Sequence, residues 1–248
     1  MFKVSIITVT YNSDKCISSC LDSIASQTYE KIEHIIIDGK SKDKTLEIIH
    51  KHPFKPAKVV SEKDRGIYDA LNKGFALATG NIIGILHSDD YYAYPGLLED
   101  VAEQFSLLDI DYLYSNVDAV NRLGKIIYSS RPRIPSDGTI KNHQIPHPGL
   151  FISRNLLKRI NPPFDSSYLI SADLKQQLII ANVIKAKGFY LNKTSVRQRL
   201  GGKSTKNIFS YIKGWIEARR AWNEVHGKGG SIFVMKKVFN KTTTFIDF

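Results

Sequence analysis

Short apolar runs alternate with helical patterns along the first hundred residues of the 248-residue chain. Val4–Val9 and Ile82–Leu86 are nearly continuous in apolar side chains, which is typical of strands covered on both faces. Further strands are expected at His34–Ile37 and Lys58–Val60, and helices at Lys15–Ser26, Lys44–His50 and Ile67–Ala78. This alternation predicts an α/β fold with a mostly parallel central sheet and flanking helices.

The pattern becomes less regular in the second half of the chain. The elements expected there are helices at Leu97–Leu108, Leu174–Lys187 and Asn207–Val225 and strands at Tyr112–Val120 and Lys125–Ser129. Beyond Arg131, prolines at positions 132, 135, 146, 148, 162 and 163 interrupt the periodicity. They predict a long functional loop region instead of a second α/β domain.

The positive charge of the chain lies in its last third. The whole sequence has 35 Lys and Arg against 24 Asp and Glu, a formal net charge of +11. Residues 175–248 contain 15 of these bases and 3 of the acids, so a net charge of +12 lies there and −1 in the rest. We therefore expect one domain over residues 1–205 and a basic, aromatic-rich helical tail over residues 206–248.

The tail contains an apolar stripe at helical spacing, which includes Trp215 and Trp222, with Lys213 and Arg219 between apolar positions. Such a stripe packs on its own domain or lies on an anionic lipid surface, and the pattern leaves both open. No run approaches the roughly 20 apolar residues of a membrane-spanning helix, so any membrane contact is expected to be peripheral.

Acidic residues follow two of the predicted strands. Asp38 ends the second strand, and His87-Ser88-Asp89-Asp90 ends the fourth. Ligands of open parallel sheets bind outside the carboxyl ends of the strands. Adjacent carboxylates there repel each other unless a cation lies between them, which favours Mg²⁺ or Mn²⁺. The alternative is that Asp89 and Asp90 only cap the next helix.

A polar junction connects the third strand to the next helix. Residues 61–74 contain three acids, three bases and two glycines, among them Asp64, Arg65 and Lys73. Cations beside a helix N-terminus suit a diphosphate. No Gly-x-Gly-x-x-Gly follows the first strand and there is no P-loop, so a dinucleotide oxidoreductase and a P-loop ATPase are not supported.

These segments together make the sequence similar to glycosyltransferase family 2, inverting sugar transferases with the GT-A fold. The segments that carry the resemblance are Val4–Ser13, Ile37–Thr45, Glu62–Gly74 and Leu86–Asp90. Three later segments resemble those family members that build bacterial surface polysaccharides. They are His147–Phe151, Phe164-Asp165 with Ser171–Asp173, and Gly201–Ser204. The resemblance covers about residues 3 to 205.

The resemblance implies roles for individual residues. Asp38 would read the imide N–H of uracil or thymine, Tyr11 would stack near the base, and Asp89 would bind the Mn²⁺ or Mg²⁺ that bridges the diphosphate. Asp173, at the start of a late helix, would be the catalytic base. The other expected donor contacts are Thr8, Asp64, Arg65, Lys73, Ser88 and Asp90, with Asp90 and His87 as weaker metal candidates and His147 and Lys203 as acceptor or phosphate contacts.

The sequence departs from the family pattern at several positions. His87 stands where the family often has Asp or Asn, which removes one carboxylate from the metal motif. Three lysines, Lys40, Lys42 and Lys44, add positive charge beside Asp38. They either attract a phosphate group or are ordinary solvated surface residues, and the sequence leaves both explanations open. The Gln-x-x-Arg-Trp pattern of processive synthases is absent, so one sugar per encounter is expected.

The expected activity is metal-dependent transfer of one sugar from a nucleotide sugar, with UDP favoured, to a lipid-diphosphate-linked glycan. The tail would bring the enzyme to anionic lipid at the inner face of the bacterial membrane. Two cysteines cannot form a disulfide framework and no signal peptide is seen, so a cytoplasmic location is expected. A nucleotidyltransferase and a non-enzymatic polyanion-binding protein are the alternatives. No nucleic-acid recognition motif accompanies the basic residues, so no nucleic acid partner is expected. The sequence does not reveal the oligomeric state.

Overall fold

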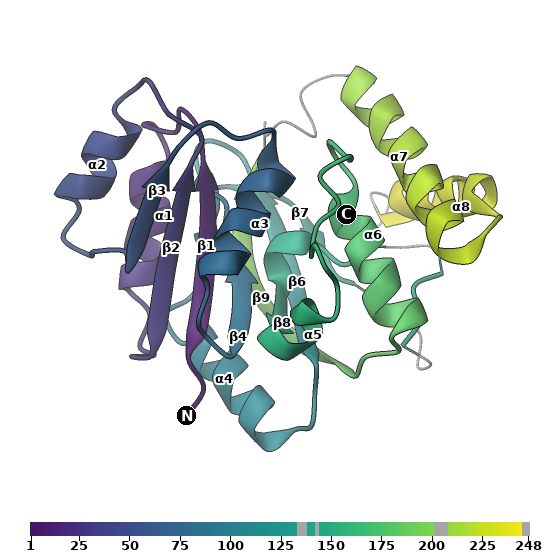
Figure 1. Cartoon of the computed structure of the whole chain (residues 1–248), viewed down its shortest axis with the longest axis horizontal. Helices are drawn as coiled ribbons and strands as arrows, with labels where there is room; N and C mark the ends of the chain where they lie inside the picture. The colour runs from purple at the N-terminus through teal and green to yellow at the C-terminus, as the bar shows by residue number, and fades with distance from the viewer. Residues whose placement is uncertain (133–137, 142–143, 201–207, 245–248) are drawn as a thin grey trace.

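The computed structural model describes residues 1–132, 138–141, 144–200 and 208–244 (Figure 1). Within these ranges the chain forms one nine-stranded sheet with helices on both faces. The strands are β1 (Val4–Thr10), β2 (Ile32–Asp38), β3 (Lys58–Ser61), β4 (Ile82–Ile85), β5 (Tyr91–Tyr92), β6 (Tyr112–Val120), β7 (Ile126–Ser130), β8 (Leu150–Ser153) and β9 (Gly188–Arg199).

Eight α-helices are found in the described ranges. They are α1 (Ile17–Ala25), α2 (Thr45–Lys51), α3 (Ile67–Leu77), α4 (Leu97–Leu107), α5 (Arg154–Lys158), α6 (Ala172–Leu178), α7 (Ile208–His226) and α8 (Gly230–Thr244). A 3₁₀ turn, η1 (His147–Gly149), precedes β8, and a π-helical turn, η2 (Ile179–Val183), extends α6.

The sheet has a parallel half and a mixed half. Its strand order is β3-β2-β1-β4-β8-β6-β9-β5, with β7 paired to β6. β3, β2, β1 and β4 are parallel, as the sequence predicts, and Thr10 lies opposite Asp38 at the ends of β1 and β2. β8 runs antiparallel to both β4 and β6, whereas β9 is parallel to β6. The carboxyl ends of β1, β2 and β4 therefore share one edge, where the predicted site residues begin.

Alternate residues of β1 enter two cores on opposite faces of the sheet. Ile7 and Val9 belong to the core that includes side chains of α3, α5 and α6, whereas Val4 and Ile6 belong to the core that includes side chains of α1, α2 and α4. Gly74 lets α3 approach the sheet closely, because a Cβ there would lie 2.4 Å from Cγ2 of Ile7. This close packing fixes α3 against β1.

The predicted loop region beyond residue 131 was partly wrong. Leu150–Ser153 forms β8 between β4 and β6, and Arg154–Lys158 forms α5. The twelve-residue strand β9 was also missed, because it is half-exposed and its polar residues hide the apolar alternation. Short runs of β-branched residues reveal strands that are covered on both faces, but they do not reveal a half-exposed strand such as β9.

The tail helices α7 and α8 lie beside each other at the α6 side of the molecule (Figure 1). Ala218 and Ala221 of α7 and Phe233 of α8 are buried in the same core as α6. Trp222 stacks on Phe233 with ring centroids 4.5 Å apart, whereas Trp215 is 45% exposed. No helix among the described residues is long and apolar enough to cross a membrane.

Candidate active site

The ends of β1 and β2 form a shallow cradle around Gly39. A Cβ on Gly39 would lie 3.3 Å from Oδ2 of Asp64 and 3.4 Å from Cδ2 of Tyr11, so both side chains flank the glycine. Tyr11 is 53% exposed, which leaves its ring available to a planar ligand. The structure thus brings together Tyr11, Gly39 and Asp64, which are separated by up to 53 positions in the sequence. We call these three residues the glycine cradle.

Asp38 lies directly beneath the cradle and is fully buried. Its carboxylate accepts hydrogen bonds from the backbone N–H and the hydroxyl of Ser41, and from the hydroxyl of Ser61 at 2.6 Å. These bonds order the loop that follows β2. The predicted contact with the nucleotide base remains a prediction, because the carboxylate is directed to the two serines.

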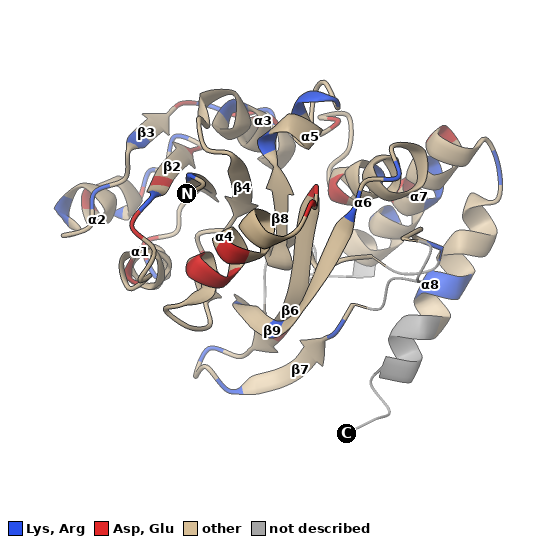
Figure 2. Cartoon of the chain, turned by 90° about the horizontal axis from the view of Figure 1, so that it is seen from below, with Lys and Arg blue, Asp and Glu red and all other residues tan. Residues whose placement is uncertain are grey.

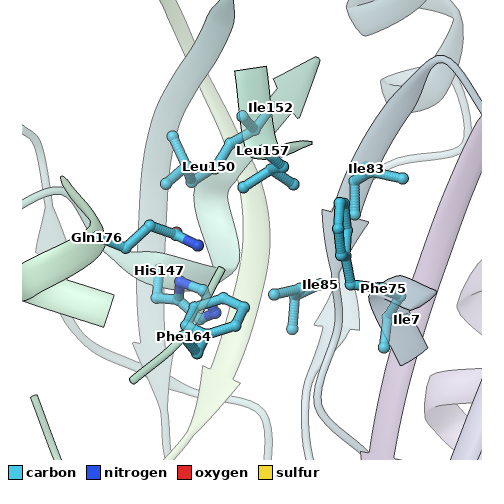
Figure 3. Close-up of a pocket in the computed structure, with 10 residues that line it drawn as sticks. All are labelled: Ile7, Phe75, Ile83, Ile85, His147, Leu150, Ile152, Leu157, Phe164 and Gln176. Carbon is cyan, nitrogen blue, oxygen red and sulfur yellow. The ribbon is translucent and has the colours of Figure 1, made fainter. Parts of the chain in front are cut away.

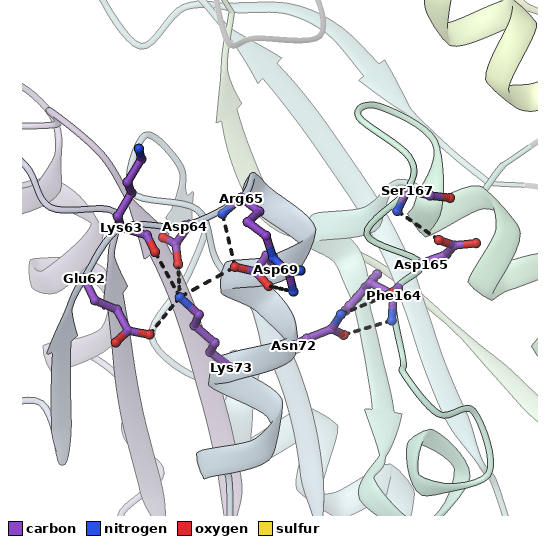
Figure 4. Close-up of polar contacts among 10 residues, drawn as sticks. All are labelled: Glu62, Lys63, Asp64, Arg65, Asp69, Asn72, Lys73, Phe164, Asp165 and Ser167. Carbon is purple, nitrogen blue, oxygen red and sulfur yellow. Dashed lines mark hydrogen bonds and ion pairs between the residues drawn. The ribbon is translucent and has the colours of Figure 1, made fainter.

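Lys73 of α3 lies among three carboxylates (Figure 4). Its ammonium group is 2.6 Å from Asp64, 2.7 Å from Glu62 and 3.6 Å from Asp69. The hydrogen bonds to Asp64 and Glu62 raise the pKa of Lys73 above its usual range. The lysine therefore stays charged and holds Asp64 in the cradle.

Arg65 is an exposed cation at the start of α3. Its guanidinium group donates to Asp69 at 3.1 Å, and its backbone N–H donates to the same carboxylate. The Arg65 side chain is 84% exposed, so it can reach a ligand outside the sheet edge. Asp69 therefore holds the backbone and the side chain of Arg65 in place, and Arg65 is the group that a ligand can reach.

Asn72 joins α3 to the proline-rich region (Figure 4). Its amide donates to the carbonyl of Phe164 at 2.7 Å and accepts from the N–H of Phe164 at 3.0 Å. Both backbone groups of the buried Phe164 are thereby satisfied. Asn72 thus has a structural task and fixes the segment that leads to α6.

The strand-end acids after β4 have different environments. Asp90 is buried, accepts from the N–H of Arg199 at 3.2 Å, and keeps its Oδ2 buried without a hydrogen-bond partner. Burial, followed by the neighbouring Asp89, raises the pKa of Asp90 well above its usual range. Asp89 is partly exposed, and no described residue donates a hydrogen bond to its carboxylate. Asp89 is therefore the accessible acid of the pair.

Two neighbouring residues hold this turn in place. The hydroxyl of Ser88 lies 2.9 Å from that of Ser13, so Ser88 is engaged within the protein. Arg199, at the end of β9, donates to the backbone carbonyl of Asp89 at 2.9 Å and covers the ring of Tyr91 at 4.7 Å. Arg199 brings a positive charge beside the two acids. Sequence reasoning missed it because β9 was not predicted.

The oxygen atoms in the turn after β4 suit a hard divalent cation, and a diphosphate could bind the same cation. The partly exposed carboxylate of Asp89 and the orphaned Oδ2 of Asp90 offer oxygen ligands, which Mg²⁺ and Mn²⁺ prefer. Within the described ranges no cluster of three or more His, Cys, Asp or Glu could hold a metal alone. A cation here would need phosphate oxygens or water for the rest of its ligands.

His87 and His147 form a half-buried pair, and three of their four ring nitrogens are buried without a hydrogen-bond partner. Their ring centroids are 6.0 Å apart, and His147 also packs edge-on against Phe164. Burial lowers the pKa of each ring to about 4, and His147 adds to the effect on His87. An uncharged His147 cannot pair with phosphate as a cation, so its predicted phosphate contact is not supported by its environment. His87 is likewise neutral at pH 7.

Asp173 lies in the first turn of α6, as predicted. Its Oδ1 is 3.2 Å from the hydroxyl of Tyr68, and its Oδ2 accepts from the side-chain amide of Gln144 at 2.6 Å. His87 lies within electrostatic range of both Asp173 and Asp89. Burial raises the pKa of Asp173, which makes its carboxylate a stronger base than an exposed one.

A small cavity lies behind the site between the sheet, α3 and α6 (Figure 3). Its lining is apolar except for His147 and Gln176, and its volume is about 10 Å³. That volume is about enough for one water molecule and is too small for a sugar.

Two predicted site residues lie elsewhere. Thr8 is fully buried within β1, and its hydroxyl lies 3.0 Å from Nε2 of His34, so the predicted donor contact was wrong. Thr8 has the same strand parity as Ile6 and faces the core of α1. Lys203 lies outside the described residues. Two groups that the sequence did not single out for the site, Gln144 and Lys237, are linked to Asp173.

Comparison with known proteins identifies the family and the fold. A family model described as "Glycosyl transferase family 2" matches residues 5–169. The E. coli protein UDP-Glc:alpha-D-GlcNAc-diphosphoundecaprenol beta-1,3-glucosyltransferase WfaP is 29% identical over 218 residues, which are 85% of this chain and 83% of WfaP. Two other curated relatives share 36% identity over 104 residues, and the matched part spans only 40% of their length.

Solved structures show the same fold. Staphylococcus aureus TarS 1-349 in complex with UDP-GlcNAc has a TM-score of 0.69 at 21% identity and covers 88% of this chain and 65% of that one. The mannosyltransferase PcManGT from Pyrobaculum calidifontis, in complex with GDP-Man and Mn²⁺, has a TM-score of 0.66 at 17% identity and covers 100% of this chain and 76% of that one. The fold prediction is therefore confirmed. Because the family model matches more than half of its residues, this chain contains a glycosyltransferase domain and belongs to glycosyl transferase family 2.

Proposed function

We propose that the protein is an inverting glycosyltransferase that moves one sugar from a UDP-sugar to a hydroxyl of a lipid-diphosphate-linked glycan. The observation that carries this proposal is that Asp89 follows β4 at the carboxyl edge of the parallel strands, while Asp173 of α6 is joined through the Tyr68 hydroxyl to α3, which begins at the donor junction. Both carboxylates are partly exposed, so a bound substrate can reach each of them. The glycine cradle at the ends of β1 and β2 lies on the same edge.

The donor site follows from the charges and the open surface at this edge. Tyr11 offers an exposed ring for the base, and the cradle has no side chain at Gly39 to obstruct it. Arg65 and Arg199 supply positive charge toward the diphosphate. WfaP is named for UDP-Glc and TarS was solved with UDP-GlcNAc, which supports UDP as the nucleotide of the donor.

The chemical step requires a proton acceptor and a stabilised leaving group. The acceptor hydroxyl gives its proton to Asp173 while its oxygen bonds to the anomeric carbon. The bond from that carbon to the diphosphate oxygen breaks on the opposite face, and its electron pair leaves with UDP, so the anomeric configuration is inverted. A Mg²⁺ or Mn²⁺ ion, when bound, neutralises charge on the diphosphate. Asp89, supported by Asp90, is the residue that would hold it.

The tail helices support an acceptor at a lipid surface. Ile232, Met235 and Phe239 recur along one side of α8 and are 59%, 70% and 69% exposed. Phe209 and Ile216 of α7 are also exposed, at 75% and 64%. Exposed apolar side chains with interspersed cations suit the interface of an anionic bilayer.

The charge of the tail fits the same partner. Lys213, Arg219 and Lys228 are exposed, and the described part of α8 carries lysines and no acid (Figure 2). The relative WfaP is named for a diphosphoundecaprenol-linked acceptor. These observations support binding at the inner face of the cell membrane. Neither alternative, a nucleotidyltransferase or a polyanion-binding protein, has a comparable observation in its favour.

Donor turnover tests the proposal. The wild-type full chain is incubated with a panel of UDP-sugars, Mn²⁺ and a lipid-diphosphate-linked sugar, and UDP release is measured. We expect acceptor-dependent release that falls about 100-fold in Asp89→Ala. The matched control Asp109→Asn alters an acid that is 94% exposed and paired with Lys187, and should keep full activity. No turnover of any UDP-sugar, or equal turnover by Asp89→Ala, would overturn the proposal.

A further inference from the structure

The predicted tail reaches the candidate base. The ammonium group of Lys237, in α8, donates to the side-chain oxygen of Gln144 at 2.7 Å. The side-chain nitrogen of Gln144 in turn donates to Oδ2 of Asp173 at 2.6 Å. A single amide therefore connects a cation of the C-terminal helix to the carboxylate proposed to remove the acceptor proton.

We propose that Lys237 is a positioning residue for Asp173: through Gln144 it fixes the orientation of the carboxylate and supplies the positive charge that faces it. This inference rests on the proposed role of Asp173 as the base. It assigns to α8, within the predicted membrane-binding tail, a part in catalysis that the family resemblance, which ends near residue 205, does not cover.

Hydrogen-bond chemistry makes this arrangement directional. A lysine ammonium group only donates, and an ionised carboxylate only accepts, whereas a glutamine amide does both. With Lys237 on one side, the amide oxygen of Gln144 must face the lysine, so its NH₂ group must face Asp173. The reversed amide would place two donors against the ammonium group and an oxygen against the carboxylate. Lys237 therefore selects the amide orientation that supports an ionised Asp173.

The backbone beside Gln144 is fixed to the helix that carries Asp173. The N–H of Ile145 donates to the side-chain oxygen of Gln177 at 3.0 Å, and the side-chain amide of Gln177 donates to the carbonyl of Ile145 at 3.0 Å. Gln177 is buried and lies one turn after Asp173 in α6. This clamp keeps Gln144 within reach of the carboxylate.

Lys237 is also directed inward by the packing of α8. Phe233, one turn earlier, is buried against Trp222, and the N–H of Gly230 donates to the side-chain oxygen of Asn223 at 2.9 Å. Residues four apart share one side of a helix, so Lys237 follows Phe233 toward the domain. Lys236 is exposed, in contrast.

The electrostatic surroundings of Asp173 give the lysine its effect. Among the described residues, Tyr68 from α3, His87 from the turn after β4 and Lys237 from α8 are the titratable groups that face it. Burial raises the pKa of Tyr68 and lowers that of His87 to about 4, so both are uncharged at neutral pH. Burial raises the pKa of Asp173, and the charge of Lys237 is the largest influence that opposes it.

The test compares full-length Lys237→Met, Lys237→Arg and the control Lys236→Met. The first readout is the pKa of Asp173, measured by ¹³C NMR of its carboxyl carbon, which is assigned with Asp173→Asn. We expect Lys237→Met to raise this pKa by about one unit, and Lys237→Arg and Lys236→Met to leave it close to wild type. Thermal unfolding of each variant reports whether α8 stays packed.

The second readout is the pH dependence of kcat/KM for transfer. In Lys237→Met the acid limb should move to higher pH by the same amount as the NMR pKa, and Lys237→Arg should restore it. An unchanged NMR pKa in folded Lys237→Met, or an equal shift in Lys236→Met, would overturn the inference. A shifted NMR pKa with an unmoved acid limb would instead contradict the proposed role of Asp173 as the base, while leaving the coupling to Lys237 in place.

Discussion

The hydroxyl of Tyr68 in α3 lies 3.2 Å from Oδ1 of Asp173 in α6, 105 residues later in the chain. The same hydroxyl lies 2.5 Å from the backbone carbonyl of Ile170. Tyr68 thus connects the helix of the donor junction to the helix of the candidate base. The buried Tyr68 side chain thus holds the two halves of the site together.

Tyr68→Phe should weaken catalysis without unfolding the protein. The change removes the hydroxyl proton that the Asp173 carboxylate shares with the Ile170 carbonyl, and it keeps the ring, which stacks on Phe164. A hydrogen bond to a charged group contributes about 1.5 kcal/mol, so kcat should fall about tenfold. Steady-state kinetics measure the effect. A fall in activity matched by a large loss of thermal stability would show that Tyr68 acts only in folding.

Gly39→Ala should block the nucleotide without straining the backbone. The new methyl group would lie 3.3 Å from Asp64 and 3.4 Å from Tyr11, within the glycine cradle. Gly39 does not have a positive φ, so alanine is compatible with its backbone. We expect UDP affinity, measured by calorimetry, to fall at least about tenfold, a loss of about 1.4 kcal/mol.

Gly214→Ala is the control for this experiment. Within the described part of the chain, a Cβ at Gly214 would meet Ile170 alone, at an ordinary contact distance of 3.6 Å. It should leave UDP binding unchanged. Unaltered affinity in Gly39→Ala would remove the cradle from the donor site.

Much of the fold and part of the site could be predicted because they depend on local pattern. The apolar runs located β1 and β4, and the strand-end rule predicted that Asp38 and Asp89 follow strands that end at the same edge of the sheet. Thr8 was predicted to contact the donor, although residues two apart in a strand point to the same face of the sheet and Ile6 faces the core that includes α1. Gln144 and Lys237 could not be foreseen, since their contact joins segments 93 residues apart and depends on how α8 packs.

Glu33 makes the stability of the protein sensitive to acid. It accepts hydrogen bonds from Lys3 at 2.8 Å and from Ser5 and Thr79. Burial raises the pKa of Glu33, but these donors outweigh it and hold the pKa at about 2. Because the unfolded value is about 4.3, the stabilisation is complete above that pH and is lost as the pH falls toward 2.

Glu33→Gln should therefore lower the free energy of unfolding by about 2 to 3 kcal/mol at pH 7. The difference from wild type should shrink below about pH 4, because the wild-type carboxylate then becomes protonated. Urea unfolding at several pH values measures this. Glu103→Gln alters an exposed acid and serves as the control. A difference that stays constant down to pH 2 would contradict the account.

The exposed side of α8 should bind anionic lipid. Replacing Met235 and Phe239 by aspartate places two charges where the apolar contact is proposed, without touching the buried Phe233. We expect binding to phosphatidylglycerol vesicles, measured by co-sedimentation, to fall at least about tenfold. Leu123→Asp changes a 93% exposed residue in another part of the fold and should have no effect. Vesicle binding that does not change with salt concentration or with these substitutions would exclude this side of α8 as the lipid-binding surface.

The most direct test of the central claim is single-turnover sugar transfer by Asp173→Asn. Wild type and variant are mixed with the UDP-sugar, Mn²⁺ and the lipid-diphosphate-linked acceptor, and the anomeric configuration of the product is read by NMR. The account predicts an inverted product from wild type and a rate lower by about 10² to 10⁴ in Asp173→Asn, with UDP affinity unchanged. A retained configuration, or transfer by Asp173→Asn at the wild-type rate, would contradict it.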